Sequence, residues 1–319
     1  MSYDNIRFSV LSSKFMWFKN LAVFRFTEPF TLDANALSEK LEERRFRPCG
    51  SLEPVSSGWF PPLGKEHHPL VHQTGGFIMM SIQTEEKILP ASVLNEMTAE
   101  KVADIEATQG RQVRRKERES IRDEVMQDML PRAFSHSRRT FAYIDARGGY
   151  LIVDSGSARK AEDFVALLRQ SLGSLSVVPL ATQERPPAVM TRWVSEGDMP
   201  STVTLESECE LRSTEEDGGI VRCRRHDLEV PEIQNHIEAG KEVIKLAFSW
   251  NDRLSLVLDE TLSVKRLRFL DLVQEAAAEV ETDDAADRFD LDFSIMSLEI
   301  AEFLPALTDM FGGEALPPK

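Results

Sequence analysis

The chain of 319 residues carries 53 Asp and Glu against 38 Lys and Arg, a formal net charge of −15. This acidity excludes a protein that coats DNA or an anionic membrane with its whole surface, and no apolar run reaches the roughly 18 residues of a membrane-spanning helix. The first residues lack the apolar core of a signal peptide, and the three scattered cysteines form no disulfide pattern. We therefore expect a soluble, cytoplasmic protein with two or three domains and no membrane partner.

The first region of the chain combines strand and helix patterns. An apolar segment rich in aromatic residues at 16–26 predicts a strand, and a second strand is expected at 76–83. Between them the spacing of Leu residues predicts a helix at 34–45, with Thr31 or Asp33 in position to cap it. These elements indicate a small α+β unit.

A long, highly charged helical pattern follows, from 91 to 130, with a basic end that reaches Arg139. Its sparse apolar residues form a thin stripe, which is typical of a helix that pairs with one partner rather than one sunk in a core. Gly110 is expected to break or bend the helix, and Pro131 ends it. Between Arg111 and Arg139, nine Lys and Arg stand against five acids, a local net charge of +4 in an acidic chain. We expect a projecting helical arm that takes part in self-association.

The remaining chain contains more sheet and helix patterns. Gly148 and Gly149 mark the turn of a β-hairpin at 140–154. Between Asp271 and Glu302, eleven acids stand against one Arg, so much of the negative charge is segregated near the C-terminus. We also expect a helix at 157–172, a strand at 176–180, a linker at 183–187, strands at 201–211, 220–226, 242–250, 254–258 and 264–269, and a short helix at 231–240.

These patterns predict an α+β fold, built as a multi-part chain of small sheet-and-helix units with a projecting helical arm. A second Met at position 16 precedes the first clear strand, so an alternative translation start there is plausible. The expected parts are an N-terminal extension (1–15), a central α+β region (16–85 and 140–182), the helical arm (86–139), a second α+β region with a tip (183–270) and an acidic helical C-terminal segment (271–319).

The first basic cluster is the arm with its flank, from Arg111 to Arg139. In one interpretation its Arg and Glu side chains form pairs four residues apart on a solvated helix. In the other interpretation, the surplus Lys and Arg side chains neutralise DNA phosphates. Phe134 lies just past the arm, where it is available for base stacking, a dimer contact or core packing.

The second basic cluster begins at Arg222, Arg224 and Arg225, which are followed by His226. Alternation along a strand places Arg222 and Arg224 on one face and Arg225 on the other. The alternative is an edge strand protected by charge. Other cations lie nearby in the sequence, namely Lys241, Lys245, Lys265, Arg266 and Arg268.

Other chemistries have weak signals in this sequence. The Gly-Gly pairs lack the Lys-Ser/Thr of a phosphate loop and indicate turns. His67, His68 and His72 have no Cys partners, so we expect no metal site there. Asp145 and Asp154 are the carboxylates that a metal-dependent nuclease would use, but no neighbouring residues mark them out. We therefore expect no catalytic residues and no cofactor.

Several segments together resemble the bacterial recombination-associated protein RdgC family, with a match from Met16 to about Ala315. In the N-terminal part the resemblance rests on Met16–Leu21, Phe46–Gly50 and Glu85–Pro90; in the remainder it rests on Leu130–Ser135, Lys160–Asp163, Leu167–Arg169, Ser171–Leu175, Glu216–Gly219 and Asn235–Lys241.

The resemblance implies a ring-shaped homodimer whose positively lined hole accepts duplex DNA without sequence preference. It also implies antagonism of RecA-promoted recombination, association with the nucleoid, a link to replication fork repair and no catalytic activity. Phe134 in the arm flank, and Arg225 with His226 in the tip, would then form the two dimer contacts. The DNA-contacting residues expected on this basis are Arg111, Arg114, Arg115, Arg118, Arg132, Arg225, Lys241 and Lys245.

Two alternatives belong to other functional classes. A metal-dependent nuclease acting on recombination intermediates would cleave DNA when Mg²⁺ is added. An adaptor that binds a recombinase directly would inhibit recombination without affinity for DNA.

Overall fold

The computed structural model describes residues 17–64, 68–215, 218–278 and 284–315. It has a mixed fold of helices and strands, as the sequence predicts, and the strands form two antiparallel sheets. The expected N-terminal extension and His67 lie outside the described residues. Within the described ranges, no helix combines the length and apolar character needed to cross a membrane.

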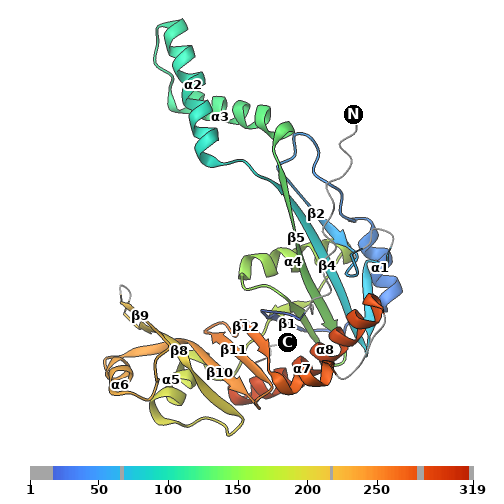
Figure 1. Ribbon diagram of the computed structural model, residues 1–319, viewed down its shortest axis with the longest axis vertical. Helices are drawn as coiled ribbons and strands as arrows, with labels where there is room; N and C mark the ends of the chain where they lie inside the picture. Colours follow the sequence, from blue (N-terminus) through green and yellow to red (C-terminus); the bar gives the residue numbers. More distant parts are fainter. Residues whose placement is uncertain (1–16, 65–67, 216–217, 279–283, 316–319) are drawn as a thin grey trace.

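The first sheet has seven strands and forms the middle of a crescent-shaped molecule (Figure 1). In spatial order its strands are β2 (Val55–Phe60), β4 (Phe77–Lys87), β5 (Ser135–Asp145), β6 (Tyr150–Val153), β1 (Ala22–Phe26) and β7 (Val177–Pro179), and β3 (Val71–Thr74) pairs with β4 beside β2.

The second sheet has five strands and forms one end of the crescent (Figure 1). In spatial order they are β12 (Val264–Phe269), β11 (Leu254–Asp259), β10 (Lys241–Trp250), β8 (Val203–Ser213) and β9 (Ile220–Arg224).

Two helices pack on a face of each sheet because their apolar residues recur on one side. On the first sheet, α1 (Ala34–Glu42) and α4 (Ala158–Leu172) bury Leu37 and Phe164 in a shared core. Asp33 caps α1 by accepting a hydrogen bond from the Ala36 amide. On the second sheet, α5 (Pro186–Glu196) and α6 (Pro231–Glu238) bury Trp193 and Ile233.

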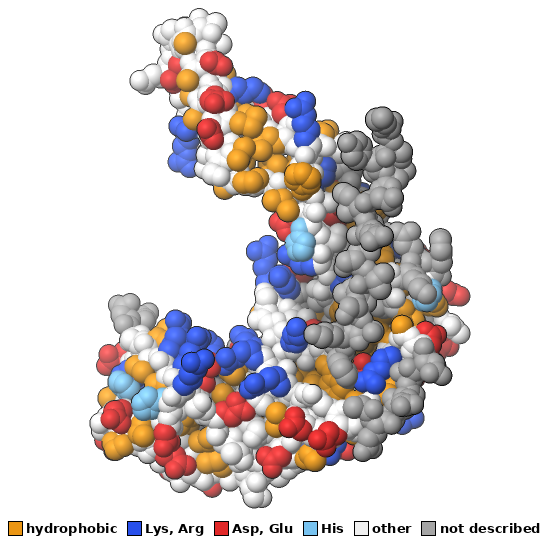
Figure 2. Space-filling model, viewed as in Figure 1, with side chains coloured by type: hydrophobic (Ala, Val, Ile, Leu, Met, Phe, Trp, Pro, Cys, Tyr) orange, Lys and Arg blue, Asp and Glu red, His pale blue; other side chains and the backbone are white. Residues whose placement is uncertain are grey.

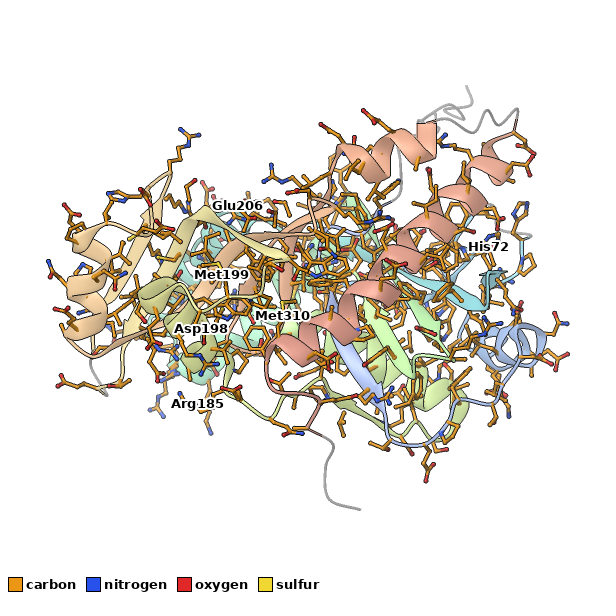
Figure 3. All side chains as sticks on the ribbon, turned by 90° about the horizontal axis from the view of Figure 1, so that it is seen from below. His72, Arg185, Asp198, Met199, Glu206 and Met310 are labelled. Carbon is orange, nitrogen blue, oxygen red and sulfur yellow. The ribbon has the colours of Figure 1, made fainter. Side chains whose placement is uncertain are left out.

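The long helix α8 (Ala285–Met310) joins the two sheets into one core, and α7 (Asp271–Ala278) precedes it. Its Phe293 packs on Tyr143 of the first sheet, and its Phe303 packs on Trp250 of the second, with ring centres 5.6 and 5.4 Å apart. Figure 3 shows α8 crossing beneath the sheets, from the region of His72 towards Met310. The sheets therefore share buried apolar side chains.

A short segment before β1 also connects the sheets. Leu21 and Val264 exchange two backbone hydrogen bonds, and the Lys19 carbonyl accepts one from the Leu267 amide. This pairing holds Lys19 beside β12, at the edge of the second sheet.

The helices of the other end of the crescent are α2 (Ala91–Gln109) and α3 (Arg115–Met129), which pack on each other (Figure 1). Gly110 ends α2 with a left-handed backbone, φ +63°, as expected of a glycine that breaks a helix. A 3-10 turn, η1 (Leu130–Arg132), then leads into β5. The hollow of the crescent lies between this helical pair and β9.

Several expected elements differ from the structure. Ser135–Arg139 does not extend the arm but forms the start of β5, where each residue pairs with β4. The strands β2 and β3 occupy a polar, Pro-containing stretch for which no strand was expected. The expected linker at 183–187 runs into α5, because Pro186 and Pro187 suit the first turn of a helix.

Candidate nucleic-acid interface

The hollow of the crescent is rich in basic side chains. Figure 2 shows Lys and Arg gathered over the second sheet on the side that faces the hollow, and more of them along the first sheet next to it. Asp and Glu predominate on the lower, outer side of the second sheet in the same view. An acidic chain therefore presents a basic inner surface.

Strand alternation explains how the second sheet builds this surface. Cys209 and Leu211 of β8 point into the core, so the acids between and beside them point to the opposite face. On β10, Phe248 packs against Trp193 of α5, with ring centres 5.8 Å apart, so α5 covers the core side and leaves the other face open. We call this open face of the second sheet the basic face. It comprises Glu206, Glu208, Glu210, Arg222, Arg224, Lys245, Asp259, Lys265, Arg266 and Arg268.

The carboxylates of the basic face are shared between cations. Glu210 lies 3.0 Å from both the Arg222 Nε and the Lys245 Nζ. Glu208 lies 3.6 Å from the Arg224 Nε and 2.8 Å from the Arg266 Nη2. Two further carboxylates have one cation each.

Glu206 pairs with Arg268 at 3.7 Å, and Asp259 pairs with Lys265 at 2.9 Å. The basic face thus contains six cations and four carboxylates, a surplus of two positive charges. This surplus attracts anions even though every cation has an acidic partner.

Two acids of the basic face, Glu210 and Asp259, have lowered pKa values. Burial acts to raise the pKa of Glu210, but hydrogen bonds from Lys245 and Arg222 outweigh it and lower that pKa. Burial likewise acts to raise the pKa of Asp259, and hydrogen bonds from Thr261 and Lys265 lower it overall. The cations that contact Glu210 and Asp259 therefore favour the charged form of these two carboxylates.

A groove runs along the basic face. Its floor includes the small side chains of Ala247 and Ser255, and its walls include cations from three separate segments of the chain. These cations are Lys19, Arg224, Arg225, Arg266 and Arg268. Arg225 sits just after β9 with a left-handed backbone, φ +54°, at the end of the strand. The groove offers several donors for an anionic chain.

The sequence prediction placed Arg222 and Arg224 on one strand face, and the structure confirms it, because both pair with acids on the same face of β8. Its placement of Arg225 on the other face is wrong, because β9 ends at Arg224 and the left-handed backbone of Arg225 turns it into the groove that Arg224 also lines. Of the expected DNA contacts, Arg225 lines the groove and Lys245 belongs to the basic face. Lys241 begins β10 opposite Ser213, half-buried, and has no ion pair within the described part of the chain.

The expected contacts on the arm divide into two groups. Arg115 pairs with Glu119 four residues on, at 3.2 Å, as the paired-helix interpretation expects. Arg111 also pairs with an acid, Glu117 at 2.5 Å, but six residues on and from the segment between α2 and α3. Arg114 and Arg118 are exposed and form no ion pair with any residue that the structure describes. The positive charges of Arg114 and Arg118 on the arm are therefore available to other partners.

Arg132 and Phe134 lie where the arm joins the first sheet. Arg132 is exposed at the end of η1, and Phe134 is 85% exposed, which rules out the core role for this ring. The backbone carbonyl of Phe134 accepts a hydrogen bond from the Ile88 amide, and Ile88 is itself half exposed. The two side chains form an apolar spot that this protomer leaves uncovered.

The start of β5 adds basic residues that the sequence prediction had assigned to the arm. Arg138 lies 3.7 Å from Glu86 across the β4–β5 pair. The guanidinium of Arg139 stacks over the ring of Phe60, 4.2 Å from its centre, and burial lowers the pKa of Arg139. Arg139 therefore has a structural role in the first sheet.

His226, the second tip residue, is exposed beside Arg225. Its amide donates to the Ser207 carbonyl, and its Nδ1 lies 2.8 Å from the Asp227 carbonyl. These bonds fix the turn after β9. Ile220, at the opposite end of β9, is a half-exposed apolar residue.

The carboxylates considered for a nuclease are not arranged as a metal pair. Asp145 accepts hydrogen bonds from the amides of Arg147 and Gly148 in a turn. Asp154 accepts from the amides of Lys19 and Asn20, and burial raises its pKa.

The Asp154 amide pairs with the Phe141 carbonyl, so Asp145 lies four residues further along β5, about 13 Å away. That separation is several times the roughly 4 Å between the ions of a two-metal site. Among the described residues, no three His, Cys, Asp or Glu side chains are grouped for metal binding.

The sequence prediction missed part of the groove. Arg266 and Arg268 were noted only as neighbours in the chain, and Lys19 was not considered. The basic pattern of 265–268 could have indicated that these residues belong to the groove. Lys19 had no such signal in the sequence, because it reaches the groove only through the pairing of Leu21 with Val264.

Two antiparallel sheets joined by one helix, with a basic face turned to a hollow, define a mixed α/β protein with an anion-attracting inner surface. Comparison with known proteins specifies the family. The model of the family described as "Putative exonuclease, RdgC" matches residues 16–314, so the chain belongs to the RdgC family.

Relatives named "Recombination-associated protein RdgC" are similar over nearly the whole chain. The Aeromonas hydrophila protein is 47% identical over 299 residues, which cover 94% of this chain and 99% of the relative. The Pseudomonas aeruginosa protein is 48% identical over 303 residues, covering 95% and 99%. The Psychromonas ingrahamii protein is 44% identical over 299 residues, covering 94% and 99%. The chain is thus a member of a family of recombination-associated proteins.

Proposed function

We propose that this protein binds duplex DNA without sequence preference and thereby modulates recombination. The observation that carries the proposal is the basic face, where six cations outnumber four carboxylates on the side of the crescent that faces its hollow. Surplus Lys and Arg neutralise backbone phosphates, which gives binding that is independent of sequence and sensitive to salt. A flat sheet face without a helix that fits a groove supports backbone contact rather than base reading.

We further propose that the DNA-bound form is a ring-shaped homodimer. One protomer is a crescent with an open hollow (Figure 1), and exposed apolar residues lie in the segment that joins the arm to the first sheet and in β9, at the edge of the second sheet. Phe134 lies at the root of the arm, and Ile220 begins β9, the strand after which Arg225 and His226 follow. Two copies that meet end to end would enclose the basic face in a closed hole.

The proposed role in recombination is inhibition of RecA-promoted strand exchange by occupation of the DNA. Relatives carry the name "Recombination-associated protein RdgC", and a protein that encircles duplex DNA would compete with a recombinase for it. The protein would then be associated with the nucleoid and would act in the repair of replication forks.

We propose that the protein is not an enzyme. The family description contains the word exonuclease, but the carboxylates that a nuclease would use are engaged in backbone hydrogen bonds about 13 Å apart. An adaptor without affinity for DNA would leave the cation surplus without a ligand.

The proposal is tested with two labelled duplexes of equal length and unrelated sequence, incubated with the protein in the presence of Mg²⁺. We expect both to bind with equal affinity and to remain intact over hours. Degradation of either duplex would favour the nuclease, and failure of both to bind while strand exchange by a recombinase is still inhibited would favour the adaptor.

The ring is tested separately with closed circular duplex. Complexes on circles should resist a wash with high salt and should be released when the circle is cut once, because a closed ring can leave only over an end. Equal release from cut and uncut circles would contradict the ring.

A further inference from the structure

The basic face contains acids at alternate positions of its central strand. Glu206, Glu208 and Glu210 all project from β8 towards the surface that would meet DNA. A face built solely to hold phosphate would gain affinity without them, since each one cancels a positive charge. Their presence on this face requires a separate explanation.

We infer that Glu208 and Glu210 limit the affinity of the basic face for backbone phosphate. These two carboxylates hold the cations in place and reduce their attraction for phosphate, so that the protein binds DNA more weakly than the cations alone would. This inference rests on the proposed DNA binding and names the residues that set its strength.

The geometry supports a positioning role for both acids. Glu210 joins Arg222 of β9 to Lys245 of β10, and Glu208 joins Arg224 of β9 to Arg266 of β12. Each carboxylate therefore holds two cations from different strands at one height above the sheet. Long side chains lose much rotamer freedom when they bind a ligand, and this arrangement orders them beforehand.

The same geometry leaves the cations accessible to phosphate. The side chains of Arg224 and Arg266 are 71% and 57% exposed, whereas that of Glu208 is 27% exposed. The guanidinium groups thus lie above the carboxylate, and an incoming phosphate meets them first. The negative charge of Glu208 would still repel that phosphate, since the charge lies well within the screening length of about 8 Å at physiological salt.

Folding stability does not explain the charge of Glu208, whereas the lowered pKa of Glu210 means that this carboxylate also stabilises the fold. Ion pairs with cations as exposed as Arg222 and Arg224 contribute little to stability. Replacing Glu by Gln keeps the size and a hydrogen-bonding oxygen while removing the charge. In Glu208→Gln/Glu210→Gln the surplus of the basic face would rise from two positive charges to four.

The test compares duplex binding by the wild-type chain, Glu208→Gln/Glu210→Gln and a control, by fluorescence anisotropy over a range of salt concentrations. Glu42→Gln is the matched control, because Glu42 also bonds an Arg, at 2.6 Å, but on α1, away from the basic face. We expect the double variant to bind about tenfold more tightly near 0.1 M salt, with a salt dependence steeper by about 0.9 for each additional phosphate neutralised. The control should bind like the wild type.

Unchanged or weaker binding by the double variant, while the wild type binds, would overturn the inference and leave the proposed function standing. Absence of binding by the wild type at every salt concentration would overturn the proposed function itself. If the double variant unfolds, Glu208→Gln is measured alone, since Glu208 is the more exposed of the two acids, with an expected gain of about threefold.

Discussion

Arg266 on β12 forms an ion pair with Glu208 on β8, 2.8 Å between Nη2 and Oε1, although β10 and β11 lie between these two strands. The groove that separates them is floored by the small side chains of Ala247 and Ser255. Arg266 has a left-handed backbone, φ +52°, beside an irregularity in the pairing of β11 with β12. The outer strand thereby contributes its charge to the middle of the basic face.

The groove cations should determine affinity for duplex DNA. Reversing two of them in Arg266→Glu/Arg268→Glu replaces attraction with repulsion, so the Kd should rise about tenfold or more near 0.1 M salt. Fluorescence anisotropy with a labelled duplex gives the value. Arg185→Glu is the control, because Arg185 pairs with Glu242 at the start of α5, on the side of the sheet opposite to the groove. Equal losses in both variants would contradict a specific role for the groove.

Phe134 should contribute to self-association and little to folding. Its ring is 85% exposed, so Phe134→Ser removes few contacts within the protomer. We expect a shift from dimer to monomer in sedimentation at micromolar concentration, and an unfolding free energy within about 0.5 kcal/mol of the wild type at a concentration where both are monomeric. Leu298→Ser, which changes another exposed apolar residue on α8, should leave the dimer intact. A dimer that survives Phe134→Ser would contradict this role.

The helix α8 should couple the stability of the two sheets. Phe303→Ala removes a fully buried ring that packs on Trp250, and the cavity should cost about 3–5 kcal/mol of unfolding free energy. Because the two sheets share this core, urea unfolding should remain a single transition at a lower midpoint. Two separate transitions, with only the second sheet destabilised, would show that the sheets fold independently.

Asp259 should make part of the stability dependent on acid pH. Burial acts to raise its pKa, but hydrogen bonds from Thr261 and Lys265 lower it overall, below the ordinary value of 3.8. A lowered folded-state pKa means that the carboxylate stabilises the fold above the unfolded-state value, and that this contribution disappears as the pH falls through the folded-state value.

Asp259→Asn should therefore destabilise the protein at pH 6, and its difference from the wild type should shrink towards pH 3. Urea unfolding at several pH values measures this difference. A gap that stays constant across this range would mean that the charge of Asp259 does not contribute.

The sequence predicted well those elements whose residues carry a local signal. Asp33 caps α1, Gly110 ends α2, and the hairpin turn at Gly148 and Gly149 lies where expected. In each case the physical cause, a cap or a left-handed backbone, resides in one or two residues.

Elements held by tertiary contacts escaped prediction. The first half of β5, Ser135–Arg139, is mostly exposed and has no apolar alternation, so only its pairing with β4 makes it a strand. The helix α8 lies within the expected acidic helical segment, but the contacts by which Phe293 and Phe303 join the two sheets depend on tertiary packing. In the site, the basic pattern of β9 could be read directly, but the contact of Arg266 with Glu208 depends on how four strands are ordered.

The most direct test of the central claim is the salt dependence of the wild-type Kd for a duplex of arbitrary sequence. Phosphate neutralisation by the groove cations predicts a straight line of log Kd against log salt concentration, with a slope of about 0.9 per phosphate contacted and thus about 4.5 for the five cations of the groove. An affinity that hardly changes between 0.05 and 0.2 M salt would contradict the account.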